Sequence, residues 1–234
     1  MGRPSLAIVI PTLDAADGLR ACLAALAEAR RDGLLSEVVL AAAGDTAASR
    51  ALAEQAGARV IDSPRGRGSQ LRAGAGAASG DWLLFLHADT LLQPGWAAEA
   101  AAFMTAENAA ERAACFRFAL DDPAPQARRI ERLANWRSRR LALPYGDQGL
   151  LIARGLYERL GGMRPLPLME DVDFVRRLVR QQGRGGLTML KSRAVTSAVR
   201  YRRGGWLLRP LRNLSILALY FAGTPPRVLA RLYG

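Results

Sequence analysis

Residues 80–90 read Gly-Asp-Trp-Leu-Leu-Phe-Leu-His-Ala-Asp-Thr, and this stretch decides the fold. Its five apolar residues, 82–86, follow a Gly-Asp turn and lead directly into polar residues that include His87 and Asp89. A short, continuous apolar run between turn residues is typical of a strand that is buried on both faces. Strands of this kind belong to parallel sheets, so the rest of the chain should alternate strands with helices.

The residues before this strand repeat the same rhythm. Residues 6–10 form a short apolar run that ends at Pro11, and the apolar residues of 19–26 are spaced as one face of a helix. The expected strands are 6–10, 37–41, 58–61 and 82–86, and the expected helices are 19–26, 46–56 and 69–78. This alternation predicts an α/β fold, with a Rossmann-like, mostly parallel central sheet flanked by helices.

Polar residues follow the expected strands, at the edge of the sheet where ligands of such folds bind. Asp89 is suited there to a hard divalent cation, which keeps few protein ligands and shares substrate phosphates. Capping of the next turn is an equally simple role for this carboxylate. His87 stands where a haloacid-dehalogenase-type phosphatase has its nucleophilic Asp, and the sequence contains no G-x-x-x-x-G-K-[ST] P-loop, so both of these classes are disfavoured.

Two further motifs carry carboxylates in the second half of the chain. Glu170, Asp171 and Asp173 open an amphipathic helix. The helix dipole favours acidic residues in the first turn, which explains the presence of at least one of them. Another is suited to accept the proton of an attacking hydroxyl group. The loop 143–149 precedes a strand-like run at 150–153. It is either a turn into an edge strand or a substrate loop.

Taken in order, these motifs resemble family 2 glycosyltransferases of the GT-A fold, and most closely a bacterial subgroup with FLHADT, PYGDQG and LMEDV motifs. The resemblance covers roughly residues 5–225, and it rests on the order and spacing of motifs that are individually weak. The segments that carry it are Ile10-Pro11-Thr12-Leu13, the loop with Gly66, Arg67, Gln70 and Gly74, Gly80-Asp81, His87-Ala88-Asp89-Thr90, Gly146-Asp147-Gln148-Gly149 and Met169-Glu170-Asp171-Val172.

The resemblance implies a metal-assisted, inverting transfer of a sugar from a nucleotide-diphospho-sugar to a hydroxyl acceptor. On the donor side it implies that Asp89 binds a divalent metal, Mg²⁺ or Mn²⁺, that bridges the donor diphosphate. The residues that it implies for nucleotide binding are Pro11, Thr12, Leu13, Arg67 and Gln70. On the acceptor side it implies Asp171 as the general base and Glu170 as its neighbour. It further implies Gly146, Asp147 and Gln148 as a substrate loop that contacts the donor sugar or the acceptor.

The sequence departs from the family pattern at three places. Ala15 and Ala42 stand where the family usually has carboxylates, although Asp14 and Asp45 lie close by. His87 replaces the first Asp of the usual D-x-D, and no second histidine exists to complete a metal site. The departures leave a second hypothesis open, that of a catalytically weak or silent nucleotide-sugar-binding module.

The amino-acid composition and the distribution of charge bear on what kind of molecule this protein binds. The 234 residues are 50% hydrophobic and 23% charged, which provides for a sizeable core and excludes wholesale disorder. The net charge of +12 is uneven, because residues 1–110 carry a net −3 and residues 111–234 a net +15. A basic nucleic-acid-binding protein is therefore a third hypothesis, but no recognition motif accompanies the charge and no nucleic acid is expected.

The C-terminal segment combines arginines with leucines and aromatic residues, and no carboxylate follows Asp173. We expect a GT-A domain over 1–203, with a nucleotide-sugar half at 1–110 and an acceptor half at 111–203, followed by a basic amphipathic helical segment over 204–234. That segment either lies on an anionic membrane or packs on the domain, and its arginines are also suited to holding the donor pyrophosphate or a lipid-phosphate acceptor. The acceptor is unknown, with a lipid-linked hydroxyl as one option.

Three observations bear on location. The longest uncharged stretch, 213–226, is too short to cross a bilayer, and no signal peptide is recognisable. Cys22 and Cys115 both have apolar neighbours, which favours buried free thiols in a reducing compartment. We expect a cytoplasmic protein, with peripheral association at the inner face of the membrane as an option.

Overall fold

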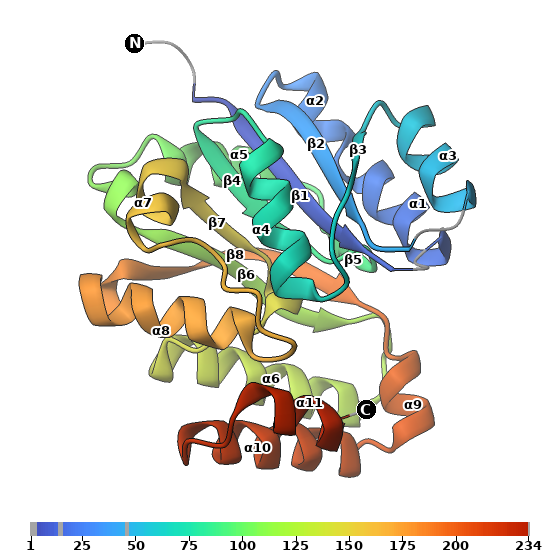
Figure 1. The fold of residues 1–234 in the computed structure, drawn as a ribbon, viewed down its shortest axis with the longest axis vertical. Helices are drawn as coiled ribbons and strands as arrows, with labels where there is room; N and C mark the ends of the chain where they lie inside the picture. The colour runs from blue at the N-terminus through green and yellow to red at the C-terminus, as the bar shows by residue number, and fades with distance from the viewer. Residues whose placement is uncertain (1–3, 14–15, 45–46, 234) are drawn as a thin grey trace.

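The computed structural model describes residues 4–13, 16–44 and 47–233. These residues form one eight-stranded mixed sheet, in the order β3-β2-β1-β4-β7-β6-β8-β5, with helices packed on both of its faces (Figure 1). The strands are β1 (Leu6–Thr12), β2 (Leu35–Ala42), β3 (Arg59–Asp62), β4 (Trp82–Phe85), β5 (Thr90–Leu92), β6 (Ala113–Leu120), β7 (Leu150–Ala153) and β8 (Leu187–Thr196). The α/β class predicted from the sequence is confirmed.

The helices connect these strands and add a C-terminal layer. The α-helices are α1 (Ala16–Ala25), α2 (Ala27–Arg31), α3 (Ala47–Gln55), α4 (Arg67–Ala77), α5 (Trp96–Met104), α6 (Pro125–Leu141), α7 (Arg154–Arg159), α8 (Glu170–Gln182), α9 (Val199–Gly204), α10 (Leu208–Phe221) and α11 (Pro226–Tyr233). Three short 3₁₀ helices are η1 (Ala109–Glu111), η2 (Gly146–Gln148) and η3 (Arg184–Gly186).

The first half of the sheet has the predicted alternation of strands and helices. Strand β1 pairs in parallel with both β2 and β4, and β2 pairs in parallel with β3. Leu6 through Ile10 are fully buried, as expected of a strand covered on both faces. The parallel arrangement brings the ends of β1 and β4 to the same edge of the sheet, where the segment 87–90 begins.

The second half of the sheet is mixed. Strand β7 is antiparallel to β4 and to β6, β6 is parallel to β8, and β5 is antiparallel to β8. Residues 150–153, for which an edge strand was one interpretation, lie inside the sheet between β4 and β6. All four are buried, which is why this run is apolar throughout and does not alternate.

Helix α6 covers backbone groups of β6 that no strand reaches. Strand β7 pairs with β6 only at Ala113 and Ala114. Further along, Asn135 accepts from the N–H of Phe118 at 2.9 Å and donates to its carbonyl at 3.0 Å. Glu131 accepts from the N–H of Leu120 at 2.7 Å. Because buried backbone groups need partners, these side chains fix α6 against the sheet.

The C-terminal helices pack on the rest of the fold. Figure 1 shows α10 and α11, in red, beside α6 and α8. Leu217 of α10 is buried in a cluster with Leu143 and Val172. No helix among the described residues is long and apolar enough to cross a membrane. Cys22 and Cys115 are buried free thiols, as predicted.

Candidate active site

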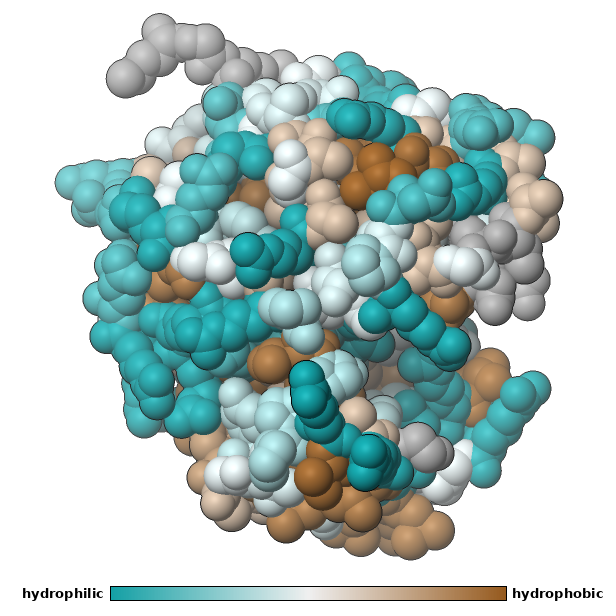
Figure 2. Space-filling view, in the orientation of Figure 1, coloured by the Kyte–Doolittle hydropathy of each residue, from teal (hydrophilic) through white to brown (hydrophobic). Residues whose placement is uncertain are grey.

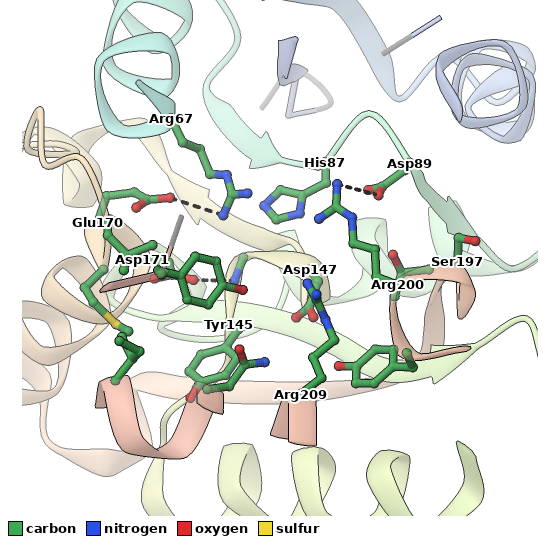
Figure 3. Close-up of a pocket in the computed structure, with 18 residues that line it drawn as sticks. Arg67, His87, Asp89, Tyr145, Asp147, Glu170, Asp171, Ser197, Arg200 and Arg209 are labelled. Carbon is green, nitrogen blue, oxygen red and sulfur yellow. Dashed lines mark hydrogen bonds and ion pairs between the residues drawn. The ribbon is translucent and has the colours of Figure 1, made fainter. Parts of the chain in front are cut away.

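A pocket of about 140 Å³ opens beyond the carboxyl end of β4 (Figure 3). Its walls come from segments that are far apart in the chain: the turn after β4, the start of α4, η2, the start of α8, the end of β8 with α9, and the helices α10 and α11. The pocket therefore lies where ligands of open α/β sheets bind.

Charged side chains of both signs line this pocket. The carboxylates are Asp89, Asp147, Glu170 and Asp171, and the guanidinium groups are those of Arg67, Arg200 and Arg209. Two ion pairs link the sets: Arg67 lies 3.6 Å from Glu170, and Arg200 lies 3.9 Å from Asp89 (Figure 3). The mixture suits a substrate that carries a diphosphate and a reacting hydroxyl group.

Asp171 is held in place by backbone groups on two sides. Its Oδ2 accepts from the N–H of Gly146 at 2.7 Å, and its Oδ1 accepts from the N–H of Val172 at 2.7 Å. Met169, just before α8, has the left-handed φ of 65° that turns the chain into the helix at this point. The carboxylate is thus oriented by the fold rather than by a flexible side-chain partner.

Gly146 leaves no room for a side chain. A Cβ at this position would lie 2.7 Å from Nε2 of His87 and 3.4 Å from Oδ2 of Asp171. The first distance is shorter than any ordinary contact of a Cβ and the second is an ordinary van der Waals contact, so the loop approaches His87 as closely as it does because residue 146 is glycine.

Glu170 is almost completely buried, with 2% of its surface exposed. Its pKa is raised to about 7, mainly by burial and also by the charge of Asp171, and the guanidinium of Arg67 opposes both effects. No hydrogen bond reaches its Oε1 within the described part of the chain. Glu170 therefore exchanges its proton near neutral pH.

Asp147 lies half-buried in η2. Its pKa is raised to about 6, mainly by burial; Arg137 opposes this shift, and the charge of Asp171 adds to it.

His87 carries no charge at neutral pH. Burial lowers its pKa well below the usual range, and the nearby Arg67 and Arg200 lower it further. Its Nε2 is buried without a hydrogen-bond partner among the described residues and faces Gly146. The backbone carbonyl of His87 accepts from the N–H of Thr90 at 3.1 Å, which shapes the turn that presents Asp89 to the pocket.

Asp173, the third carboxylate at the start of α8, has a structural task. It pairs with Arg177 at 2.9 Å and with Arg164 at 3.1 Å, and it does not line the pocket. This residue accounts for part of the acidic motif without any catalytic role.

The comparisons with known proteins agree with this geometry. The sequence profile of the family described as Glycosyl transferase family 2 matches residues 7–159, well over half of the chain. The chain belongs to glycosyltransferase family 2. It is accordingly a glycosyltransferase of this family, with the type of sugar left open.

Solved structures share its GT-A fold. Glucosyl-3-phosphoglycerate synthase from Mycobacterium tuberculosis, in complex with Mn²⁺, uridine diphosphate and glucosyl-3-phosphoglycerate, superposes with a TM-score of 0.61 at 16% identity, covering 83% of this chain and 70% of the other. The same enzyme with Mn²⁺, UDP-glucose and phosphoglyceric acid gives a TM-score of 0.59 at 18% identity, with 80% and 69% covered. A search of curated proteins gives no match.

The structure places part of the predicted nucleotide-binding set outside this family 2 pocket. Pro11, Thr12 and Leu13 lie at the end of β1, where Thr12 is buried and Leu13 is 43% exposed. The amide of Gln70 donates to the carbonyls of Thr12 at 2.7 Å and Ala41 at 2.9 Å, and so ties the ends of β1 and β2 together. Among the predicted nucleotide-binding residues, Arg67 lines the pocket.

In the predicted substrate loop, Gly146 and Asp147 line the pocket but Gln148 does not. Gln148 is fully buried; it donates to the carbonyl of Phe116 at 2.9 Å and accepts from the hydroxyl of Ser138 at 2.6 Å. Its amide is thus committed to the core, which leaves it no group for a substrate.

The positions that depart from the family pattern are only partly visible. Ala42 is buried at the end of β2, and its carbonyl accepts from the N–H of Ser63 at 2.8 Å. The nearby Asp14, Ala15 and Asp45 lie outside the described residues.

The pocket also contains residues that the motifs did not identify. Arg209 and Asn213 come from α10 and Tyr233 from α11, so the C-terminal segment forms one wall. The guanidinium of Arg209 lies 5.6 Å from the ring centre of Tyr201. The sequence signal for this wall is the arginine-rich run without carboxylates after Asp173, which is compatible with a membrane surface, with packing on the domain and with arginines that hold a phosphate.

Proposed function

We propose that this chain catalyses the inverting transfer of a sugar from a nucleotide-diphospho-sugar to a hydroxyl acceptor. The observation that carries the proposal is the meeting of Asp89, at the end of β4, and Asp171, at the start of α8, in one pocket with three arginines. Carboxylates on opposite walls can divide the work: Asp89 is placed to act on the donor phosphates and Asp171 to accept the proton of the acceptor hydroxyl.

Asp89 is the residue we propose for the metal. No group of three His, Cys, Asp or Glu side chains among the described residues could hold an ion alone. A single carboxylate fits Mg²⁺ or Mn²⁺ when the donor phosphates complete the coordination, as hard cations commonly require. When bound, the ion would offset the negative charge on the leaving diphosphate. The Mn²⁺ and uridine diphosphate in structures of the same fold support this assignment.

The chain's own residues provide the rest of the donor site. Arg67 and Arg200 face the pocket beside Glu170 and Asp89, where guanidinium groups can bind phosphate oxygens in pairs. The nucleoside of the donor is proposed to bind at the adjacent end of β1, at Pro11, Thr12 and Leu13. Gln70 of α4 belongs to the same proposed site, because its amide supports the end of β1.

On the acceptor side, Asp171 takes the proton of the hydroxyl as its oxygen attacks the anomeric carbon. The bond from that carbon to the diphosphate breaks on the opposite face of the sugar, which inverts its configuration. The two backbone hydrogen bonds of Asp171 support this role, because they aim the carboxylate before the substrates arrive. Gly146 and Asp147 form the adjoining part of the acceptor site.

The alternative function is a binding module that does not turn over, motivated by Ala15 and Ala42. Nucleotide release from a panel of nucleotide-diphospho-sugars, with and without Mn²⁺, separates the two functions. A transferase releases nucleotide in the presence of an acceptor and loses this activity in Asp89→Ala and Asp171→Asn. Calorimetric binding of a donor with no release across the acceptor panel would instead establish the silent module. The nucleic-acid alternative loses ground, because the chain belongs to glycosyltransferase family 2 and its candidate pocket is lined by four carboxylates.

We also propose that the protein works in the cytoplasm, at the inner face of the membrane, on an acceptor carried by a lipid. Helix α10 supports this, because Leu207, Leu208 and Leu211 at its start are 76%, 71% and 58% exposed while Arg209 and Asn213 line the pocket from its other face. Figure 2 shows hydrophobic residues gathered along the edge of the molecule formed by α10 and α11. An apolar helix face flanked by arginines is suited to an anionic lipid surface.

A further inference from the structure

A second concave site, separate from the candidate active site, lies between α6 and the strands β6 and β8. This groove has a volume of about 370 Å³ and shares no residue with the pocket described above. Five arginines line it: Arg117 of β6, Arg132, Arg139 and Arg140 of α6, and Arg193 of β8. Trp136 lines it as well, together with Asn135 and Glu131, whose side chains bind backbone groups of β6. We name it the arginine groove.

Two of these arginines stand directly opposite one another. Arg117 and Arg193 are neighbours across the parallel pair β6 and β8, so their side chains leave the same face of the sheet. Like charges in this position destabilise a sheet. The pairing depends on a register shift between Cys115 and Arg117, and the carboxylate of Glu99 supports the shifted strand by accepting from the N–H groups of Lys191 and Ser192.

No carboxylate of the described residues pairs with these arginines. Glu131 is the carboxylate that lines the groove, and it is already committed to the N–H of Leu120 and to Arg128, which lies outside the groove. The fold thus holds several guanidinium groups around one concave space with no negative partner from the protein.

We propose that the arginine groove binds a phosphate-bearing ligand. Guanidinium groups present paired N–H donors that match two phosphate oxygens, and several of them around one space favour a ligand with more than one negative charge. Trp136, which is 53% exposed at the groove, offers an apolar ring beside the charged floor. The phosphate belongs either to a small soluble molecule, such as a diphosphate, or to the headgroup of an anionic lipid.

Binding of pyrophosphate to the full chain tests the proposal without reference to glycosyl transfer. Titration followed by calorimetry and by tryptophan fluorescence should show a binding event that shifts the emission. The double variant Arg117→Gln/Arg193→Gln should bind at this site at least about tenfold more weakly, because two charge-assisted contacts are lost. Trp136→Phe should abolish the fluorescence change, since Trp82 and Trp96 are buried and the fourth tryptophan, the half-buried Trp206, does not line the groove.

Matched variants separate this site from the pocket and from general electrostatics. Arg67→Gln, in the pocket, should retain the event, and Arg20→Gln/Arg129→Gln, which removes the same charge from exposed positions, should retain it as well. Sedimentation with phosphatidylglycerol vesicles distinguishes the sources: vesicle binding that Arg117→Gln/Arg193→Gln weakens and the control pair does not identifies a lipid headgroup, and vesicle binding that Arg117→Gln/Arg193→Gln leaves unchanged identifies a soluble phosphate. Equal affinity in Arg117→Gln/Arg193→Gln and the unaltered chain overturns the proposal, as does equal loss in the control pair.

Discussion

The backbone N–H of Gly146 donates a 2.7 Å hydrogen bond to Oδ2 of Asp171, 25 residues further along the chain. This bond joins the loop before β7 to the first turn of α8, and so brings two motifs of the sequence to one point. It also sets the distance between the two walls of the pocket, since Gly146 packs directly against His87 on its other side. The predictions below begin from this contact.

Replacement of Asp171 by Asn should lower the rate of transfer while donor binding persists. Asn keeps the shape of the side chain but does not accept the proton of the hydroxyl, and loss of a positioned base costs about 10²- to 10⁴-fold in rate. Steady-state kinetics should therefore show a lower kcat, with donor affinity by calorimetry close to that of the unaltered chain. A normal kcat in Asp171→Asn would remove this residue from the base position.

Asp173→Asn is the matched control, two residues further along the same helix. Its carboxylate pairs with Arg177 and Arg164 and does not line the pocket. Removal of one partner from a largely buried ion pair costs about 3 kcal/mol of stability. This variant should lower the midpoint of urea unfolding, and its folded fraction should keep kcat.

Gly146→Ala should impair transfer through a steric effect. The added Cβ would lie 2.7 Å from Nε2 of His87, so either the loop or the imidazole must move, and the bond to Asp171 lengthens with the loop. His87→Ala in the same chain removes the obstructing ring and should restore part of the activity. No recovery in the double variant would count against the contact with His87 as the cause.

Gly76→Ala provides the control for that substitution. Gly76 lies in α4, and a Cβ there would meet nothing within 4 Å. Because alanine is favoured over glycine in a helix by about 0.5–1 kcal/mol, this variant should raise the melting temperature slightly and leave kcat unchanged.

The buried carboxyl groups predict that stability falls as pH rises. The pKa of Glu170 is raised from 4.5 to about 7 and that of Asp147 from 3.8 to about 6. Between pH 4 and pH 7 the folded chain therefore binds more protons than the unfolded chain, so the free energy of unfolding decreases across this window. Urea unfolding at a series of pH values measures the slope, and Glu170→Gln should flatten it between pH 4.5 and 7.

How far the sequence predicts this molecule depends on the range of the interactions involved. The strands β1 to β4 follow from local apolar runs. Asp89, Asp147, Glu170 and Asp171 reach one pocket because their motifs follow a strand, precede one or open a helix. Strands β5, β6 and β8 were not predicted, because their pairing joins segments far apart in the chain. Gln70 and Gln148 carry no local sign that their amides serve backbone groups of distant strands.

The charged C-terminal run illustrates the same limit. Its composition is compatible with a membrane surface and with packing on the domain, and sequence periodicity does not choose between them. In the structure α10 packs on the domain through the buried Ile216 and Leu217, while Leu208 and Leu211 face outward. Only the arrangement of α10 against α6 and α8 reveals that Arg209 belongs to the pocket.

Substitution of the outward leucines of α10 should abolish the proposed association with membranes and leave the pocket intact. The full chain should float with vesicles that contain phosphatidylglycerol and not with pure phosphatidylcholine, because its arginines contribute about 1 kcal/mol each near an anionic surface. Leu207→Ser/Leu211→Ser removes two side chains that are 76% and 58% exposed and should stay at the bottom of the gradient. Leu133→Ser, 50% exposed on α6, is the control and should still float. Retained turnover of a soluble acceptor in the double variant separates the membrane surface from the chemistry, whereas flotation of that variant would place any membrane contact elsewhere on the molecule.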